Sequence, residues 1–182
     1  QQNGVRPDKD ATIMVMGPPH LMLAALRAKR IVQAAMLSAP HFFLAQDAGF
    51  NTLAFAGDTI KAITGGVGTT TKMIKQKPQL VTKFMNGNAK GLRFFQKNRE
   101  KSVDVLLKRT KLKNRKMGYR TWDFYKTNLT KDGSISEELQ RALIEKEKKR
   151  AKVSGDIPLG RVYDFSFTKK AYRNLVTGGW KP

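Results

Sequence analysis

Short apolar runs alternate with helical spacing along the first third of the chain. Residues 11–16, 31–37 and 51–56 are apolar stretches with β-branched members, too short for stable helices and long enough for buried strands. Between them, residues 20–30 and 41–48 place apolar side chains three to four positions apart. Because the connections are short and strands alternate with helices, the pattern predicts a βαβαβ unit with a mainly parallel sheet.

Each helix of this predicted unit follows a turn that contains proline. The turns are residues 17–19 (Gly-Pro-Pro) and 38–40 (Ser-Ala-Pro). Both would lie at the carboxyl ends of parallel strands, where free backbone N–H groups and the positive ends of helix dipoles point outward. The two turns therefore predict a ligand site at one edge of the sheet. A pair of ordinary loops that bind nothing is the alternative.

The rest of the chain is predicted to be a connector followed by helices. Residues 57–71 are rich in glycine, but they lack the spacing and the Lys-Ser/Thr ending of a phosphate-binding loop, so we expect a connector there. Beyond it, apolar positions recur at helical spacing. The predicted helices cover residues 72–76, 78–96, 100–111, 117–129, 136–151 and 168–175.

Composition narrows the classes of site. The chain of 182 residues is 40% hydrophobic, which is sufficient for a core. It contains no cysteine, which excludes disulfides, thiolate metal sites and a cysteine nucleophile. Its two histidines, His20 and His41, are far apart in sequence without a carboxylate cluster, so we expect no metal and no cofactor. No apolar run approaches the roughly 20 residues of a transmembrane helix, and no signal peptide is visible.

Positive charge is concentrated after residue 66. The net charge is +21; residues 67–182 contain 29 Lys and Arg against 10 Asp and Glu, or +19. Such a field favours anionic partners. A basic nucleic-acid-binding protein is the alternative function. It is disfavoured because the basic residues are interspersed over several predicted helices and no helix-turn-helix, zinc or RNP signature is present.

The order of four segments resembles a family of transport proteins. It is similar to the nitrate/sulfonate/taurine solute-binding proteins of bacterial ABC importers, which are related to the thiamine-pyrimidine-precursor proteins. The similar segments are residues 21–54 (LMLAALRAKRIVQAAMLSAPHFFLAQDAGFNTLA), 67–100 (VGTTTKMIKQKPQLVTKFMNGNAKGLRFFQKNRE), 132–144 (DGSISEELQRALI) and 162–175 (VYDFSFTKKAYRNL).

The resemblance implies an α/β fold of the periplasmic binding protein type II kind. On that template, residues 1–59 are the latter part of a partial lobe two. Residues 60–68 are the hinge, or return crossing, and residues 69–182 are the helical C-terminal part of lobe one. Nearly half of a whole family member has no counterpart, so we expect a truncated form with a small parallel lobe followed by a mostly helical one.

The resemblance also implies a function. It predicts an extracytoplasmic component, periplasmic or at the cell surface, that binds a small anionic or polar solute between two lobes and docks on an ABC permease in the membrane. Carried over position by position, the ligand wall consists of Gly17, Pro18, Pro19, Ser38, Ala39, Pro40, His41, Ile63 and Thr64. For His41, a surface position at the start of a helix is the alternative to a ligand contact.

Catalysis is not expected. Pyrimidine-precursor synthases share the implied fold, but the yeast-type enzymes carry a cysteine-rich motif and this chain has no cysteine. Neither predicted turn brings together a Ser/His/Asp group or a pair of carboxylates. The sequence therefore predicts a protein that is not an enzyme.

Overall fold

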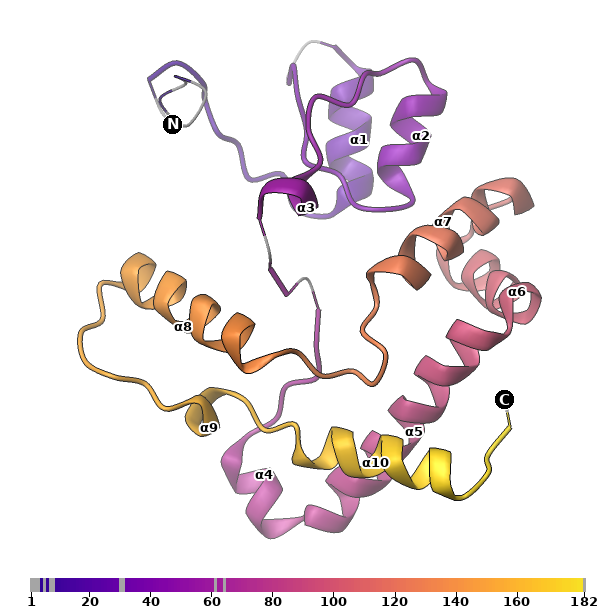
Figure 1. Ribbon diagram of the computed structural model, residues 1–182. Helices are drawn as coiled ribbons and strands as arrows, with labels where there is room; N and C mark the ends of the chain where they lie inside the picture. The colour runs from indigo at the N-terminus through magenta and orange to yellow at the C-terminus, as the bar shows by residue number, and fades with distance from the viewer. Residues whose placement is uncertain are drawn as a thin grey trace. The chain divides into compact units, whose positions relative to one another are not determined.

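The chain forms two compact units, each built from helices (Figure 1). The computed structural model describes residues 4, 6, 9–29, 32–60, 62, 63 and 65–181. The first unit comprises residues 1–53 and the second residues 54–182, whereas the predicted lobe ended at residue 59 and the predicted hinge covered 60–68. About 60% of the chain is helical, and the described residues form no sheet.

Ten helices lie within the described residues. The first unit contains α1 (Pro19–Arg27) and α2 (His41–Asp47). The second contains α3 (Ala56–Thr59), α4 (Thr71–Gln76), α5 (Pro78–Lys97), α6 (Arg99–Thr110), α7 (Arg115–Asn128), α8 (Glu137–Ala151), α9 (Leu159–Val162) and α10 (Ser166–Thr177). The six helices predicted after residue 71 are confirmed as α4 to α8 and α10.

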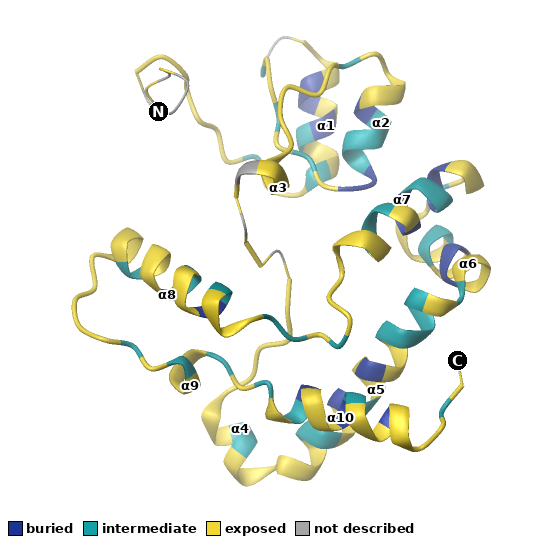
Figure 2. Ribbon diagram, viewed as in Figure 1, coloured by how far each residue is buried: buried dark blue, intermediate teal, exposed yellow. Residues whose placement is uncertain are grey.

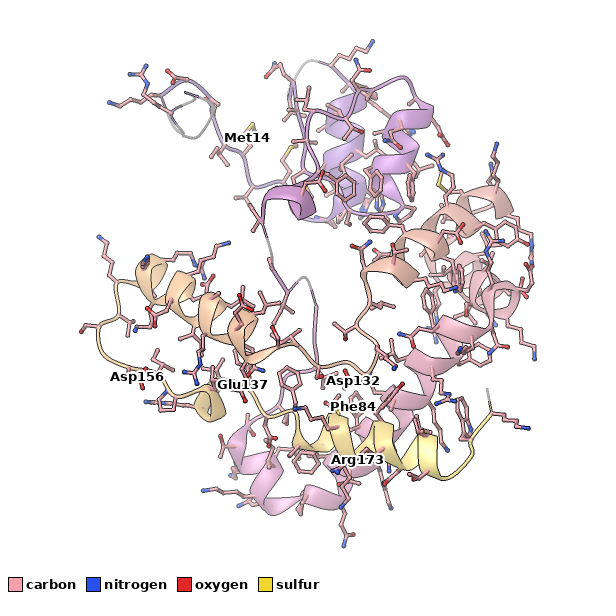
Figure 3. All side chains as sticks on the ribbon, in the orientation of Figure 1. Met14, Phe84, Asp132, Glu137, Asp156 and Arg173 are labelled. Carbon is pink, nitrogen blue, oxygen red and sulfur yellow. The ribbon has the colours of Figure 1, made fainter. Side chains whose placement is uncertain are left out.

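The predicted βαβαβ lobe is wrong, and with it the α/β, type II-like fold class. Residues 11–16, 32–37 and 51–55 do not pair into a sheet. Several of their apolar side chains face solvent: Val15 is 98% exposed and Leu53 85%, and Met14 projects from its segment (Figure 3). Residues 32–37 instead contribute partly buried side chains to the core of the first unit. A strand is stabilised by a paired neighbour and a buried face. No paired neighbour is present for these segments within the described residues, so they remain irregular.

The core of the first unit lies between its two helices. Leu23 and Leu26 of α1 pack with Ala45 of α2, and partly buried residues close the cluster (Figure 2). Proline at the first position of α1 suits the fixed φ of a helix start. Gly49, at φ +86°, follows the end of α2, close to the predicted end at residue 48, because glycine tolerates the left-handed conformation.

The core of the second unit centres on α5 and α10. Met85 and Ala89 of α5 pack against Ala171 and Leu175 of α10. Three partly buried residues, Val81, Phe167 and Trp180, surround this cluster. Part of the apolar stripe predicted along residues 78–96 faces α10, whereas Phe84 of that stripe is 57% exposed.

Helices α6 and α7 form a closely packed hairpin. Val103 of α6 is fully buried, and Gly118 of α7 faces it. A Cβ atom at position 118 would lie 2.8 Å from Val103 Cγ1, so only glycine allows this approach without a shift. Trp122 is 4% exposed, and its Nε1 donates to the carbonyl of Phe95 at 2.9 Å, which ties α7 to the end of α5.

Candidate functional site

The first predicted turn leads directly into α1. Gly17 is exposed and has φ +77°, a conformation that favours glycine. Pro18 is the extended residue before the helix, and Pro19 is its first residue. The Pro18 carbonyl accepts from the backbone N–H of Leu21 at 3.0 Å. The structure therefore uses this turn to start a helix, as the spacing predicted.

The second predicted turn starts α2 in a similar way. Ser38 is exposed, whereas Ala39 and Pro40 are buried and joined by a cis peptide bond. The Ser38 carbonyl accepts from the backbone N–H groups of His41 at 2.8 Å and Phe42 at 3.2 Å. These are the first amides of α2 that we expected to face a ligand. Because these N–H groups already donate to the Ser38 carbonyl, a ligand at this turn would have to contact side chains.

Both helices of the first unit begin at the same end of that unit (Figure 1), and each has a histidine in its first turn, His20 in α1 and His41 in α2. Burial lowers the pKa of His41, and repulsion from His20 lowers it further. His20 is exposed. The Nδ1 atom of His41 is buried and has no hydrogen-bond partner among the described residues. At neutral pH His41 is therefore an uncharged imidazole with one unsatisfied ring nitrogen.

Two predicted wall residues, Ile63 and Thr64, follow residue 53, where the first unit ends. Ile63 belongs to the second unit and is 41% exposed. Thr64 lies outside the described residues. The group that the first unit assembles therefore consists of the two turns with His41, and it includes His20, which the sequence analysis did not select. The position of His20 directly after the Gly-Pro-Pro turn is the sequence feature that could have identified it.

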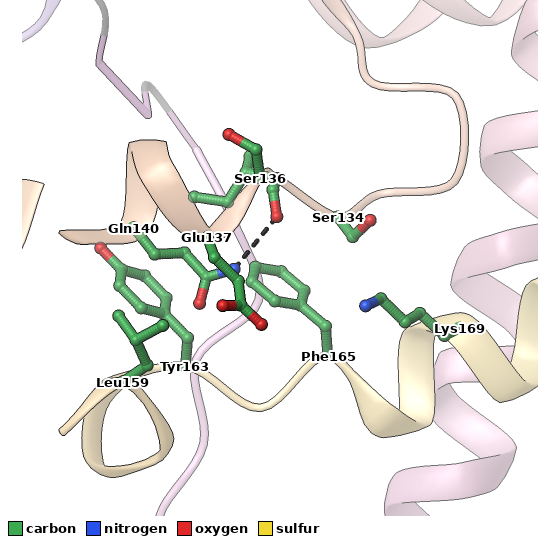
Figure 4. A pocket seen from close by; sticks show the side chains of 9 residues that line it. Ser134, Ser136, Glu137, Gln140, Leu159, Tyr163, Phe165 and Lys169 are labelled. Atoms are coloured by element: carbon green, nitrogen blue, oxygen red, sulfur yellow. Dashed lines mark hydrogen bonds between the residues drawn. The ribbon is translucent and has the colours of Figure 1, made fainter. Parts of the chain in front are cut away.

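A second polar site lies in the other unit and was not predicted. An open groove of about 500 Å³ runs beside the first turn of α8 (Figure 4). Gln140 is buried, and its Nε2 donates to the Ile135 carbonyl at 3.0 Å. Glu137 and Lys169 place opposite charges along the groove (Figure 4). The full lining is Ser134, Ile135, Ser136, Glu137, Gln140, Leu159, Tyr163, Phe165 and Lys169.

Aromatic side chains form the apolar part of this groove. The rings of Tyr163 and Phe165 lie parallel, with centroids 6.0 Å apart and an interplanar angle of 9°. They leave no room for a planar ligand between them, since stacking on both sides needs about 7 Å. The groove can therefore hold a small polar molecule against an aromatic edge, with charged groups of both signs nearby.

A network of ion pairs crosses the α6–α7 hairpin. The Arg115 guanidinium donates to Asp104 at 2.6 Å and to Glu100 at 2.9 Å. The Tyr119 hydroxyl donates to Glu100 at 2.6 Å, and this bond, followed by the one from Arg115, holds the pKa of Glu100 below its ordinary value. Arg99 pairs with Asp123 at 2.8 Å. The network thus neutralises both acidic groups of α6.

Two further classes of site receive no support. Among the described residues, no three His, Asp or Glu side chains gather closely enough to hold a metal ion. No helix in that part of the chain is both long and apolar enough to cross a membrane.

Comparison with protein-family models, with curated proteins and with solved structures finds no match to this chain. The resemblance described above therefore remains a prediction from the sequence.

Proposed function

We propose that this protein binds a small anionic or polar solute and delivers it to the permease of an ABC importer on the extracytoplasmic side of the membrane. Two observations support the proposal. One is the resemblance of four segments to solute-binding proteins. The other carries more weight: a buried ring nitrogen of His41 has no partner among the described residues, at a turn where the resemblance implies ligand contact.

The unsatisfied nitrogen favours a ligand for a physical reason. Buried polar atoms in folded proteins almost always have a hydrogen-bond partner, and leaving one without a partner costs about 1–3 kcal/mol. A neutral imidazole offers a donor or an acceptor at Nδ1 according to its tautomer. A bound solute with a matching group would satisfy His41 and recover this free energy.

The neighbouring groups define the class of solute. The Ser38 hydroxyl is exposed and makes no hydrogen bond to another described residue, so it can donate to an oxygen atom. His20 adds an exposed imidazole whose ring N–H can donate a hydrogen bond. Together these groups suit a small solute with several oxygen atoms, such as a sulfonate, nitrate or a carboxylate.

Delivery to a permease rests on the resemblance alone. The described residues form no α/β lobes, so the proposal does not include closure of two such lobes around the solute. Binding is instead assigned to the two helix starts of the first unit.

A ligand screen tests this proposal. The melting temperature of the protein would be measured with nitrate, bicarbonate, small sulfonates, pyrimidines and aromatic acids. A solute present at one hundred times its dissociation constant stabilises the folded state by about 2.7 kcal/mol. We expect at least one oxygen-rich solute to raise the melting temperature of the wild-type protein in a saturable way.

Two histidine variants locate the site. His41→Leu removes the unsatisfied nitrogen and should abolish the shift. His20→Leu removes the exposed second imidazole of the group and should weaken the shift less than His41→Leu does. If no solute shifts the melting temperature and none copurifies, the proposal is wrong. If both variants respond like the wild type, the solute binds elsewhere, and Lys169→Ala then tests the groove beside α8.

A further inference from the structure

The tip of the α6–α7 hairpin carries the densest positive charge in the described structure. Six of the nine residues from 108 to 116 are Lys or Arg, and none is acidic. They span the last turn of α6, the connecting loop and the first turn of α7 (Figure 1). All six side chains are exposed. The helix boundaries thus place this contiguous basic run at the turn between two helices.

Most of this charge is not neutralised by ion pairs. Arg115 is paired with Glu100 and Asp104. Among the described residues, no salt bridge involves the other five cations, which are Lys108, Arg109, Lys111, Lys113 and Lys116. The end of α8 differs, because residues 145–152 contain two glutamates that pair with Lys148 and Arg150. Attraction for a polyanion is therefore concentrated at the hairpin tip.

The tip is held in a fixed shape. Asn114 caps α7, and its Oδ1 accepts from the backbone N–H groups of Lys116 at 2.9 Å and Met117 at 3.4 Å. Below the cap, the buried Val103 packs against Gly118. Because the backbone is fixed by these contacts, only the cationic side chains lose freedom when a partner binds.

We propose that this tip binds duplex nucleic acid through its phosphates, without reading the base sequence. Five exposed cations in one turn match the dense, regular charge of a duplex. The two aromatic rings of α7 nearest the tip are not free to stack on a base. Trp122 is buried, and the Arg99 guanidinium covers the Tyr119 ring, with its Cζ atom 4.3 Å from the ring centroid. This disfavours single strands, whose binding relies on aromatic platforms.

The same surface does not suit a lipid bilayer. Residues 108–116 include no exposed large hydrophobic side chain, and membrane attachment through a helical segment normally combines basic charge with an inserted apolar face. Binding to a duplex requires only the charge. Because this surface belongs to the second unit, whereas the proposed solute site lies in the first, the two proposals can fail independently.

The number of unpaired cations at the tip determines how strongly duplex binding should depend on salt concentration. If all five cations contact phosphates, the logarithm of the binding constant falls against the logarithm of salt concentration with a slope of about −4.5. Raising the salt from about 50 to 200 mM then weakens binding by about 500-fold. With two contacts left, the slope falls to about −1.8 and the loss to about 12-fold.

Fluorescence anisotropy with a random-sequence duplex of about 20 base pairs tests the proposal. The variant Lys108→Gln/Lys113→Gln/Lys116→Gln removes three tip charges. The matched control, Lys146→Gln/Lys149→Gln/Lys152→Gln, removes three charges from the end of α8. We expect the tip variant to bind much more weakly at about 50 mM salt and to lose about 2.7 from the slope, while the control keeps both values near wild type.

Several results would overturn the proposal. Equal losses in the tip variant and the control would show that binding follows net charge alone. Tighter binding to a single strand than to the duplex would exclude the duplex assignment. Tip-dependent binding to vesicles containing an anionic lipid, with no binding to the duplex, would assign the surface to a membrane instead. Circular dichroism of both variants shows that a loss of binding does not arise from unfolding.

Discussion

The contact between Val103 and Gly118 provides a sharp test of the hairpin packing. Val103→Ala removes two fully buried methyl groups, which costs about 2–3 kcal/mol including the cavity. Gly118→Ala gains about 1 kcal/mol of helix propensity. It also places a Cβ atom 2.8 Å from Val103 Cγ1, an overpacking that costs about 1–3 kcal/mol because the branched valine cannot rotate away. We expect a net loss of about 0–2 kcal/mol.

The double variant should be more stable than the sum of the two single-variant losses in unfolding free energy predicts. In Val103→Ala/Gly118→Ala the new Cβ occupies part of the space left by the valine, and only its contact with Leu107 at 3.2 Å remains tight. We expect a favourable coupling of about 1–2 kcal/mol. Urea unfolding of the four proteins, followed by tryptophan fluorescence and circular dichroism, measures it.

An exposed glycine supplies the control. Gly87 of α5 has no neighbouring atom within 4 Å of the place that a Cβ would occupy, so Gly87→Ala should stabilise by up to about 1 kcal/mol and add to Val103→Ala without coupling. If the Val103/Gly118 pair is also additive within about 0.5 kcal/mol, the two helices do not pack as described.

Four further substitutions test other parts of the structure. Val15→Asp should change the free energy of unfolding by no more than about 0.5 kcal/mol, because Val15 is 98% exposed; a loss of several kcal/mol would indicate a buried strand. Ser136→Ala should cost about 1 kcal/mol, since its hydroxyl caps α8 by accepting from the Leu139 N–H at 3.2 Å, whereas Ser134→Ala should cost less. The pKa of Glu100 is held below its ordinary value of 4.5, so this carboxylate stabilises the fold above pH 4.5 and stabilises it less as the pH falls below 4.5. Glu100→Gln should therefore flatten the decline of the urea midpoint in that pH range.

The helices were predictable because their signals are local. Amphipathic spacing predicted residues 78–96, and α5 covers Pro78–Lys97. Proline at the first helical position and Gly49 after α2 marked ends correctly. The capping residue of α8 is harder to identify from sequence, because Ser134 and Ser136 both precede the helix; the Ser134 hydroxyl bonds to Asp132, and Ser136 caps the helix. Two serines two positions apart offer the same local signal, and only the backbone geometry separates them.

The failure of the predicted strands to form could not be foreseen, because the stability of a strand is not local. A run such as residues 11–16 has the composition of a buried strand, but composition does not supply the partner that a strand needs. The short helices α3 (Ala56–Thr59) and α9 (Leu159–Val162) were missed for a related reason, since four residues show no periodicity.

The candidate site was predictable in part. The positions of the two turns before helices followed from proline and spacing. The hydrogen bonds from the first N–H groups of α2 to the Ser38 carbonyl could not be predicted, because they depend on the backbone conformation of the turn. The pairing of Arg115 with Glu100 and Asp104 likewise joins residues 11 and 15 positions apart, so the unpaired charge at the hairpin tip emerged only from the structure.

The most direct test of the proposed function is a histidine NMR titration. The ring nitrogen signals of His41 and His20 would be followed while an oxygen-rich solute that stabilises the protein is added at neutral pH. We predict a saturable shift of His41 Nδ1, which gains its missing partner, and a smaller change at the exposed His20. Saturation of solute binding with no change at His41 Nδ1 would contradict the assignment of the site.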